Sequence, residues 1–471
     1  MDASKYKDYI LSLIFYRYLS EHGEKLAKEA LANLGYVLEP RYCFSSLIKG
    51  IEDGSFTISL LQEAVEAVTA SAKTPEAKAA FDGIFDSLDL NARELGKDEE
   101  QRTRLISRVL LKINDIPFGA GDAAMDVLGT AYMILIGLFA SDAGKKGGEF
   151  FTPAQLSRLC ARLACLGLSE IPSACDPAMG SASMLLEIPR AAGSVSVGHF
   201  YGQEKNRTTY NLARMNMLIH GIPCGKFSFF NDDTISSDQF GNRKFRVQVA
   251  NPPYSQKWDA SQEFLNDPRF SGPGRLAPRS YEDFAFLLHM IWHMDEQGQA
   301  AVLLPHGVLF RGGAEAVIRT YIVENLNVLD AVIGLPPGCF HSTPIPVCCL
   351  VFKRNRGANR DNILFMDASR CFIPGKKTNT ISDETLDRIV SACEMRTDQE
   401  KFCRAVPLTE VLENGCSLTI SRYVDLSEKT PPVDLAQVQS DLKRHRARCL
   451  SLEQEVNQYL SRLGLSGEDY E

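Results

Sequence analysis

The chain has 471 residues, of which 45% are hydrophobic, and its formal net charge is −8. This length exceeds one typical domain and predicts two or three folded units with a sizeable core. The negative charge argues against a surface that binds nucleic acid over its whole area, because neutralisation of phosphates drives such binding. Any contact with DNA is therefore expected to be local or to come through a partner.

No segment indicates a membrane or secreted protein. The longest uncharged apolar run, Val127–Ser141, has 15 residues and is too short for a membrane span, and the opening MDASKYKDY is no signal peptide. We therefore expect a cytoplasmic protein. The thirteen cysteines fit a reducing compartment because they are scattered and odd in number. No CxxC pair occurs and the eight histidines show no ligand spacing, so the sequence predicts no metal site.

The first 125 residues read as a helical unit. Apolar residues follow helical spacing in Tyr6–Leu19, Val65–Ala72 and Gln101–Ile113, and β-branched runs are few. No group of residues in this unit indicates catalysis.

The next informative segment is Ser173–Glu187, which reads SACDPAMGSASMLLE. It predicts a short apolar strand, then Asp176, then a turn of small residues, then a helix that opens at about Ser183. Gly180 and the small residues after it let the chain pass close to a ligand at a helix amino terminus.

Three further strands are expected to end on polar residues. Gly198–Glu204 ends on an acid 28 positions after Asp176, where it could accept hydrogen bonds from both ribose hydroxyls of a nucleoside cofactor. Lys226–Phe230 ends near Asp233, and Phe245–Ala250 ends at Asn251. These spacings are typical of strand-helix-strand units, whose ligands bind at the carboxyl edge of the sheet. Each polar residue could instead cap a helix or lie in a solvated loop.

Residues 251–254 read Asn-Pro-Pro-Tyr and follow the fourth strand directly. The trio of an amide, a bare carbonyl and an aromatic ring suits methylation of a planar NH2 group. Asn251 Oδ1 and the Pro252 carbonyl can hold the amine's protons, and Pro253 stiffens the segment because proline fixes φ. Tyr254 can stack on a flat substrate. The alternative is a proline-rich turn with a capping asparagine.

Downstream segments predict DNA contacts and the rest of the sheet. Lys257-Trp258 and Arg269–Arg279 combine cations with glycine and proline and are the candidate for local DNA binding, with an ordinary surface loop as the alternative. A helix reading FAFLLHMIWHM and a strand reading QAAVLLP follow, and Val328–Leu335 and Val347–Lys353 predict two more strands. About seven strands result.

The carboxyl-terminal segment predicts a long helix. After a possible N-cap at Asp434, apolar residues repeat at spacings of three and four from Leu435 to Leu463, and Gly464 ends the pattern. A stripe of four heptads favours a coiled-coil or bundle helix that needs a partner surface. The alternative is that it packs on its own domain.

Several motifs together resemble one known family. They are GGEFFTPAQLSRL (Gly147–Leu159), GQEKNRTTYNLARMNMLIHGI (Gly202–Ile222), NPPYSQKW (Asn251–Trp258) and the run Gly307–Arg354. The chain is similar over nearly its whole length to the modification subunit of type I restriction-modification systems, which are S-adenosylmethionine-dependent adenine-N6 DNA methyltransferases.

This resemblance implies an architecture and a set of site residues. The expected fold is α/β, a class I S-adenosylmethionine-dependent methyltransferase (Rossmann-like, about seven strands), with an all-α N-terminal domain (1–125), a catalytic domain (126–428) and a C-terminal coiled-coil-like helix (429–471). The implied residues are Glu149, Phe150, Phe151, Thr152, Pro153 and Ala154 at the methionine end of the cofactor; Asp176, Gly180, Ser181, Ala182 and Ser183 in the turn beside it; Glu204 at the ribose and Asp233 near the adenine; Asn251, Pro252, Pro253 and Tyr254 as the catalytic tetrapeptide; and Phe340 as a second wall for the target base.

The chain departs from the family in its small-residue turn. The family often has glycine where this chain has Ala182 and Ser183, which dislike positive φ, and Met179 is bulkier than the residue expected there. This puts the tightness of cofactor binding in question.

The resemblance also implies partners. These are double-stranded DNA, a DNA-specificity subunit that docks on the C-terminal helix, a second methyltransferase subunit and an ATP-dependent restriction subunit. No GxxxxGK[ST] motif occurs in the sequence, so ATP-driven steps would belong to another polypeptide. The rival functions are methylation of glutamine side chains or of guanine N2 in RNA, methylation of cytosine N4, and a noncatalytic scaffold that clamps DNA.

Overall fold

The computed structural model describes residues 3–25, 36–116, 129, 131–138, 152–340, 345–376, 378–427 and 434–464. Contacts along the chain divide it into two compact units, Met1–Asp425 and Leu426–Glu471. The helices of the amino-terminal segment therefore share a unit with the sheet. The division into three domains at residues 125 and 428 remains a prediction.

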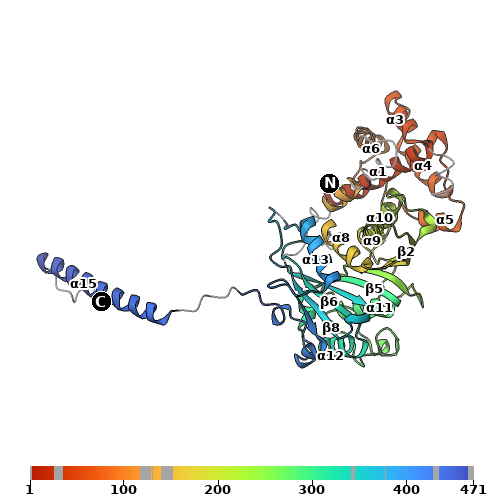
Figure 1. Cartoon of the computed structure of the whole chain (residues 1–471). Helices are drawn as coiled ribbons and strands as arrows, with labels where there is room; N and C mark the ends of the chain where they lie inside the picture. The colour runs from red at the N-terminus through yellow and green to blue at the C-terminus, as the bar shows by residue number, and fades with distance from the viewer. Residues whose placement is uncertain are drawn as a thin grey trace. The chain divides into compact units, whose positions relative to one another are not determined.

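A single sheet forms the centre of the first unit (Figure 1). Its strands are β1 (Ile171–Asp176), β2 (Val197–Gln203), β3 (Phe227–Phe230), β4 (Phe245–Ala250), β5 (Met294–Pro305), β6 (Leu329–Gly334), β7 (Val347–Lys353), β8 (Asn362–Asp367) and β9 (Cys403–Pro407). The strand order is β3-β2-β1-β4-β5-β7-β6-β8-β9. The expected α/β fold is confirmed, but the count of about seven strands is too low, because β8 and β9 extend the sheet beyond β6.

The strands that matter for the site run parallel. β3, β2, β1, β4 and β5 pair in parallel, whereas β7 is antiparallel to both β5 and β6. In this register Asp176 pairs with Gly202, and Gln203 pairs with Phe230. The residues that follow β1, β2, β3 and β4 therefore meet at one edge, the carboxyl edge expected for ligands of such a sheet.

Helices cover both faces of this sheet (Figure 1). One face carries α8 (Ala154–Cys165), α9 (Ser183–Ala192), α10 (Arg207–Ile219) and α13 (Asp383–Met395), with α8 in contact with α9 and α13. On the other face lie α11 (Asp283–Trp292), which contacts β5, and α12 (Ala314–Thr320). The short α14 (Leu408–Glu413) follows β9.

The amino-terminal helices are α1 (Ala3–Lys25), α3 (Phe44–Asp53), α4 (Ile58–Ala70), α5 (Pro75–Phe81) and α6 (Glu99–Asn114). They confirm the three helical patterns expected there, although α4 begins before the expected Val65 and ends at Ala70, short of Ala72. Their connection to the sheet domain runs through α10, which contacts α1. Hydrogen bonds of Arg214, Asn211 and Tyr18 hold the two regions together, and each is called a fixed point between them.

The main fixed point is Arg214, a fully buried side chain on α10. Its guanidinium donates to the carbonyls of Ala79 (2.9 Å), Ala80 (3.1 Å) and Asp82 (2.8 Å) at the end of α5. These are the carbonyls that a helix end leaves without intrahelical partners. Burial lowers the pKa of Arg214 to about 10.

Two neutral hydrogen bonds add to the connection. Asn211 Nδ2 donates to the Gly83 carbonyl at 2.6 Å, and the Tyr18 hydroxyl of α1 donates to the Leu218 carbonyl at 3.0 Å. Buried polar contacts of this kind fix a relative orientation more tightly than apolar packing alone, because each bond has a preferred direction.

The second unit contains α15 (Leu435–Arg462), as predicted. Asp434 caps it by accepting hydrogen bonds from the N–H groups of Ala436 (2.9 Å) and Gln437 (3.1 Å). The apolar repeat is exposed, with Leu442 at 54%, Val456 at 54% and Tyr459 at 64%.

Two properties expected from composition can be compared with the structure. All thirteen cysteines are free thiols, and eleven of them are buried. Among the described residues, no helix has the length and apolar character that crossing a membrane requires.

Candidate active site

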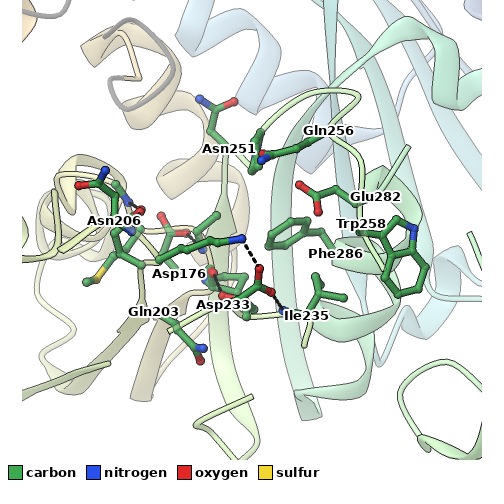
Figure 2. A pocket seen from close by; sticks show the side chains of 18 of the residues that line it. Asp176, Gln203, Asn206, Asp233, Ile235, Asn251, Gln256, Trp258, Glu282 and Phe286 are labelled. Carbon is green, nitrogen blue, oxygen red and sulfur yellow. Dashed lines mark hydrogen bonds and ion pairs between the residues drawn. The ribbon is translucent and has the colours of Figure 1, made fainter. Parts of the chain in front are cut away.

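A cavity of about 930 Å³ lies at the carboxyl edge of the parallel strands (Figure 2). Eight of the residues predicted from sequence line it: Thr152, Asp176, Gly180, Ser183, Glu204, Asp233, Asn251 and Pro253. They come from segments up to about a hundred residues apart, brought together by the strand order. The volume lies in the range of pockets that bind nucleoside-sized ligands.

The turn after β1 passes directly beside the cavity. Asp176 is buried, and its Oδ1 accepts a hydrogen bond from the Ala178 N–H at 2.9 Å. Burial raises the pKa of Asp176 to about 8. Gly180 and Ala182 both have positive φ, 52° and 62°, and the Ala182 N–H donates to the Met179 carbonyl at 2.7 Å. Ala182 therefore does adopt the left-handed conformation that alanine disfavours.

Two predicted residues of this turn lie behind the cavity wall. Ser181 and Ala182 are fully buried and do not line the cavity. Asn216 of α10 donates from Nδ2 to the Ser181 carbonyl at 2.8 Å and so holds the turn against α10. Bulky Met179 is accommodated because residue 202 is glycine: a Cβ there would lie 2.4 Å from Met179 Sδ.

Glu204 follows β2 and is tied to two neighbouring segments. Its Oε2 accepts from the Gly180 N–H at 3.2 Å, and its Oε1 accepts from the Asn206 N–H at 2.8 Å. Burial raises the pKa of this carboxyl above its usual value despite those bonds. The side chain thus joins the ends of β1 and β2 and keeps further lone pairs for a ligand in the cavity.

Asp233 follows β3 and forms an ion pair with Lys205 at 2.8 Å (Figure 2). It also accepts hydrogen bonds from the N–H groups of Ile235 (3.1 Å) and Ser236 (3.0 Å). Burial alone would raise the pKa of Asp233, but the bonds from Lys205 and Ser236 bring it below its ordinary value. This carboxylate therefore stays ionised at neutral pH.

The tetrapeptide after β4 is held by side chains on both sides. Asn251 Nδ2 donates to Thr152 Oγ1 at 3.0 Å, and the Tyr254 hydroxyl donates to Asn251 Oδ1 at 2.6 Å. The Tyr254 and Phe340 rings meet edge to face at 5.9 Å, with an angle of 84° between their planes. Burial raises the pKa of Tyr254 well above its usual value. Tyr254 and Phe340 are brought together, but neither lines the cavity, and nor does Pro252.

Other predicted residues are placed differently. Pro153 and Ala154 open α8 and do not line the cavity. Glu149, Phe150 and Phe151 lie outside the described residues.

Sequence reasoning missed the wall opposite the strand ends. Gln256, Trp258, Glu282 and Phe286 line it, in the same cavity as Asn251 (Figure 2). Of these, only Trp258 was singled out from sequence, as part of the segment expected to bind DNA. Burial raises the pKa of Glu282 to about 7, and the charge of Asp233 adds to this. An acid one residue before a strongly apolar helix was the only available signal in the sequence.

The segment expected to bind DNA is only partly available. Arg269 is buried, and its guanidinium donates to Asp267 (2.7 Å) and to the carbonyls of Thr234 (3.1 Å) and Ile235 (2.9 Å). Its charge is used inside the protein, so the expectation fails for Arg269. Lys257, Arg275 and Arg279 of the same region are exposed.

One group of described residues has the chemistry of a metal site. The expectation that the histidines lack ligand spacing was therefore wrong. His289 and His293 are four residues apart and lie with Asp238 in a cluster whose ligand atoms are within 4.8 Å of one another. His293 Nε2 lies 3.1 Å from Asp238 Oδ2, and Arg269 Nη1 lies 3.1 Å from His289 Nδ1. The guanidinium charge opposes a cation here, and the absence of a metal remains our prediction.

A doubly wound sheet with acids after its first three strands and Asn-Pro-Pro-Tyr after its fourth defines the class I methyltransferase fold. Residues 123–431 match the family model described as N-6 DNA Methylase, and residues 1–113 match that of the HsdM N-terminal domain. The chain belongs to the N-6 DNA methylase family, as a methylase subunit of the type I restriction enzyme kind.

Individual relatives agree with this assignment. The chain is 32% identical to the type I restriction enzyme MpnII methylase subunit of Mycoplasma pneumoniae, over 92% of this chain and 88% of that protein. It is 31% identical to the HindI methylase subunit of Haemophilus influenzae, over 72% and 79%. The crystal structure of the type I restriction-modification methyltransferase subunit from Streptococcus thermophilus superposes with a TM-score of 0.81 at 35% identity, covering 90% of this chain and 96% of that one.

Proposed function

We propose that this protein transfers the methyl group of S-adenosylmethionine to the N6 amine of adenine in double-stranded DNA, as the modification subunit of a type I restriction-modification complex. One observation carries the proposal. Asn251, at the end of β4, lines the same cavity as Glu204 and Asp233, at the ends of β2 and β3. A methyl acceptor at Asn251 and a nucleoside held by the two acids would therefore share one cavity.

The residues present fit the cofactor. S-adenosylmethionine supplies an electrophilic methyl sulfonium when bound. Glu204 would accept hydrogen bonds from the ribose hydroxyls, since its carboxylate keeps lone pairs beyond the two it uses for Gly180 and Asn206. Asp233 would lie near the adenine, and Thr152 and the turn at Gly180 would line the methionine end. The Phe286 ring lines the cavity and offers an apolar surface for a purine.

Asn251 and Pro252 would act on the methyl acceptor by position and charge. The lone pair of an exocyclic amine is drawn into its ring, so nucleophilic attack requires acceptors that hold both protons and draw the nitrogen toward tetrahedral geometry. Asn251 Oδ1 and the Pro252 carbonyl provide two such acceptors and stabilise the positive charge that develops on nitrogen. The proton then passes to water, so no strong base is required.

Adenine N6 lies inside the duplex, so the target base must rotate out of the stack at a cost of a few kcal/mol. Stacking on Tyr254, with Phe340 as a second wall, would offset this cost. In the structure these rings contact each other edge to face at 5.9 Å. A purine would have to enter between or beside them, so we expect this aromatic pair to rearrange when DNA binds.

The exposed apolar stripe of α15 supports the proposal that the chain works in a complex. Leu442, Val456 and Tyr459 are more than half exposed along one helix, and an apolar face of this length needs a partner surface. We propose that a DNA-specificity subunit covers it. A second methyltransferase subunit and an ATP-dependent restriction subunit would complete the assembly.

The test is Asn251→Ala in the full-length chain assembled with its specificity subunit. We expect methyl transfer to adenine in DNA to fall by about a thousandfold or more, whereas calorimetry shows S-adenosylmethionine binding changed by less than about threefold. Transfer at the wild-type rate would refute the role of the tetrapeptide. No cofactor binding by the wild-type chain at millimolar concentration would favour a noncatalytic scaffold, and labelling of cytosine, of RNA or of a glutamine side chain instead would favour another substrate.

A further inference from the structure

A buried ionic network contacts the chain just after the tetrapeptide Asn251–Tyr254. The N–H of Ser255, the residue after Tyr254, donates to Asp283 Oδ1 at 3.1 Å. Asp283 Oδ2 accepts from Arg311 Nη1 at 3.1 Å, and the same nitrogen reaches Glu315 Oε1 at 3.1 Å. The Asp283 and Glu315 side chains are 0% and 1% exposed. Segments after β4 and β5 thus converge on one backbone N–H.

The conformation of Ser255 explains why such a support is needed. Its φ is +53°, in the left-handed region, which is strained for a residue with a Cβ. The hydrogen bond to a buried carboxylate can offset this strain, because hydrogen bonds to charged groups are stronger than those between neutral groups. The adjacent Gln256 carbonyl also accepts from the Glu282 N–H at 3.1 Å, so the loop is anchored twice to the start of α11.

Arg311, the cation of this network, is itself held in place. Its guanidinium stacks over the Tyr281 ring at 4.2 Å from the ring centre. A Cβ on residue 307 would lie 2.4 Å from Arg311 Nη2, so only glycine leaves room for it there. The two buried acids share this one cation, so losing it would leave like charges facing each other.

We propose that Asp283, paired with and oriented by Arg311, is a positioning residue for methyl transfer. It holds Ser255 in the left-handed conformation and so fixes the direction in which the acceptors of Asn251 and Pro252 point. The inference rests on the proposed function and deepens it. Asp283 does not line the cavity, so we expect its loss to act on the rate of transfer rather than on cofactor binding.

The experiment compares Asp283→Ala and Asp283→Asn in the full-length chain assembled with its specificity subunit. We expect single-turnover transfer to fall about a hundredfold in Asp283→Ala, the scale at which a misplacement of about 1 Å acts, with the dissociation constant for S-adenosylmethionine changed by less than about threefold. Asp283→Asn keeps an acceptor for Ser255 and should restore the rate about tenfold over alanine, although it places an uncharged amide against Arg311.

The matched control is Asp330→Asn. Asp330 on β6 is also buried, at 2% exposure, and pairs with Arg396 at 3.1 Å, but it does not line the cavity. We expect this variant to lose thermal stability while its transfer rate stays within about twofold of wild type.

Three outcomes would overturn the inference. They are a wild-type rate in Asp283→Ala, a rate in Asp283→Asn no higher than in Asp283→Ala, and an equal loss of rate in Asp330→Asn. The two proposals fail distinguishably. If wild type transfers methyl and Asn251→Ala does not, a negative result at Asp283 refutes the positioning role alone; if wild type transfers none, the proposed function fails and this inference with it.

Discussion

Glu282 places an ionisable group in the cavity wall at a cost that can be measured. Burial raises its pKa from 4.5 to about 7. The folded protein therefore keeps the proton over a pH range in which the unfolded chain has released it. The free energy of unfolding should fall as the pH rises from about 4.5 to about 7 and then level off, since stability falls with pH wherever the unfolded state binds fewer protons.

The magnitude follows from that shift. With no screening, this shift makes the free energy of unfolding fall by about 2.5 kcal/mol between pH 5 and pH 8. Solvent screening of a carboxyl that faces a cavity reduces the fall to about 1 kcal/mol. Glu282→Gln removes the titration but keeps the shape of the side chain. The quantity to compare is the free energy of unfolding of the variant minus that of wild type. We expect this difference to be about 1–2.5 kcal/mol more favourable to the variant at pH 8 than at pH 5.

Urea unfolding followed by tryptophan fluorescence suits this test. The protein has two tryptophans, Trp258 and Trp292; one lines the cavity and the other ends α11, so the signal reports on the region of Glu282. Glu263→Gln, a change at an exposed acid, is the control, and its stability should follow that of wild type at both pH values. If the difference between Glu282→Gln and wild type is the same at pH 5 and pH 8, the reasoning is wrong.

Three further changes probe other parts of the chain. Ala182→Gly should raise the thermal midpoint by an amount equivalent to about 0.5 kcal/mol, because relief of the left-handed strain exceeds the added entropy of the unfolded glycine; a lowered midpoint would contradict this. Arg214→Met should cost about 3 kcal/mol and speed proteolysis of the amino-terminal helices, because the carbonyls at the end of α5 lose their donors; unchanged protease resistance would argue against the fixed point. Leu442→Glu with Val456→Glu should leave the melting of the sheet domain unchanged but weaken binding of the specificity subunit at least about tenfold, as judged by gel filtration and titration; binding at wild-type affinity would place that contact elsewhere.

The strands that form the site could be predicted because the sequence marks their ends. Pro252 cannot donate to a ladder, and β4 ends at Ala250, as expected. β7 likewise spans the predicted Val347–Lys353. β8 and β9 were missed although β8 is as long as β1, because the place of β8 between β6 and β9 exists only in the folded sheet.

The near wall of the cavity was predictable and the far wall was not. Strand ends in a parallel sheet meet at one edge, so Asp176, Glu204 and Asn251 could be grouped from spacing alone. Glu282 belongs to the wall only because the loop after β4 is hydrogen-bonded to the start of α11. Arg269 shows the reverse case: its charge suggests DNA binding in the sequence, but Asp267 and two backbone carbonyls take up its donors in the fold.

The hydrogen bonds of Asn251 connect two motifs that the sequence places a hundred residues apart. Because Nδ2 donates to Thr152, the amide oxygen faces the Tyr254 hydroxyl, and a carbonyl-type oxygen keeps a second lone pair after accepting that bond. In the proposed mechanism this lone pair is the one that accepts a hydrogen bond from the amine. Thr152 was expected from sequence only at the methionine end of the cofactor, but it also sets the direction of the catalytic oxygen. A shift of Thr152 on cofactor binding would therefore be transmitted to the site of methyl transfer through its hydrogen bond with Asn251.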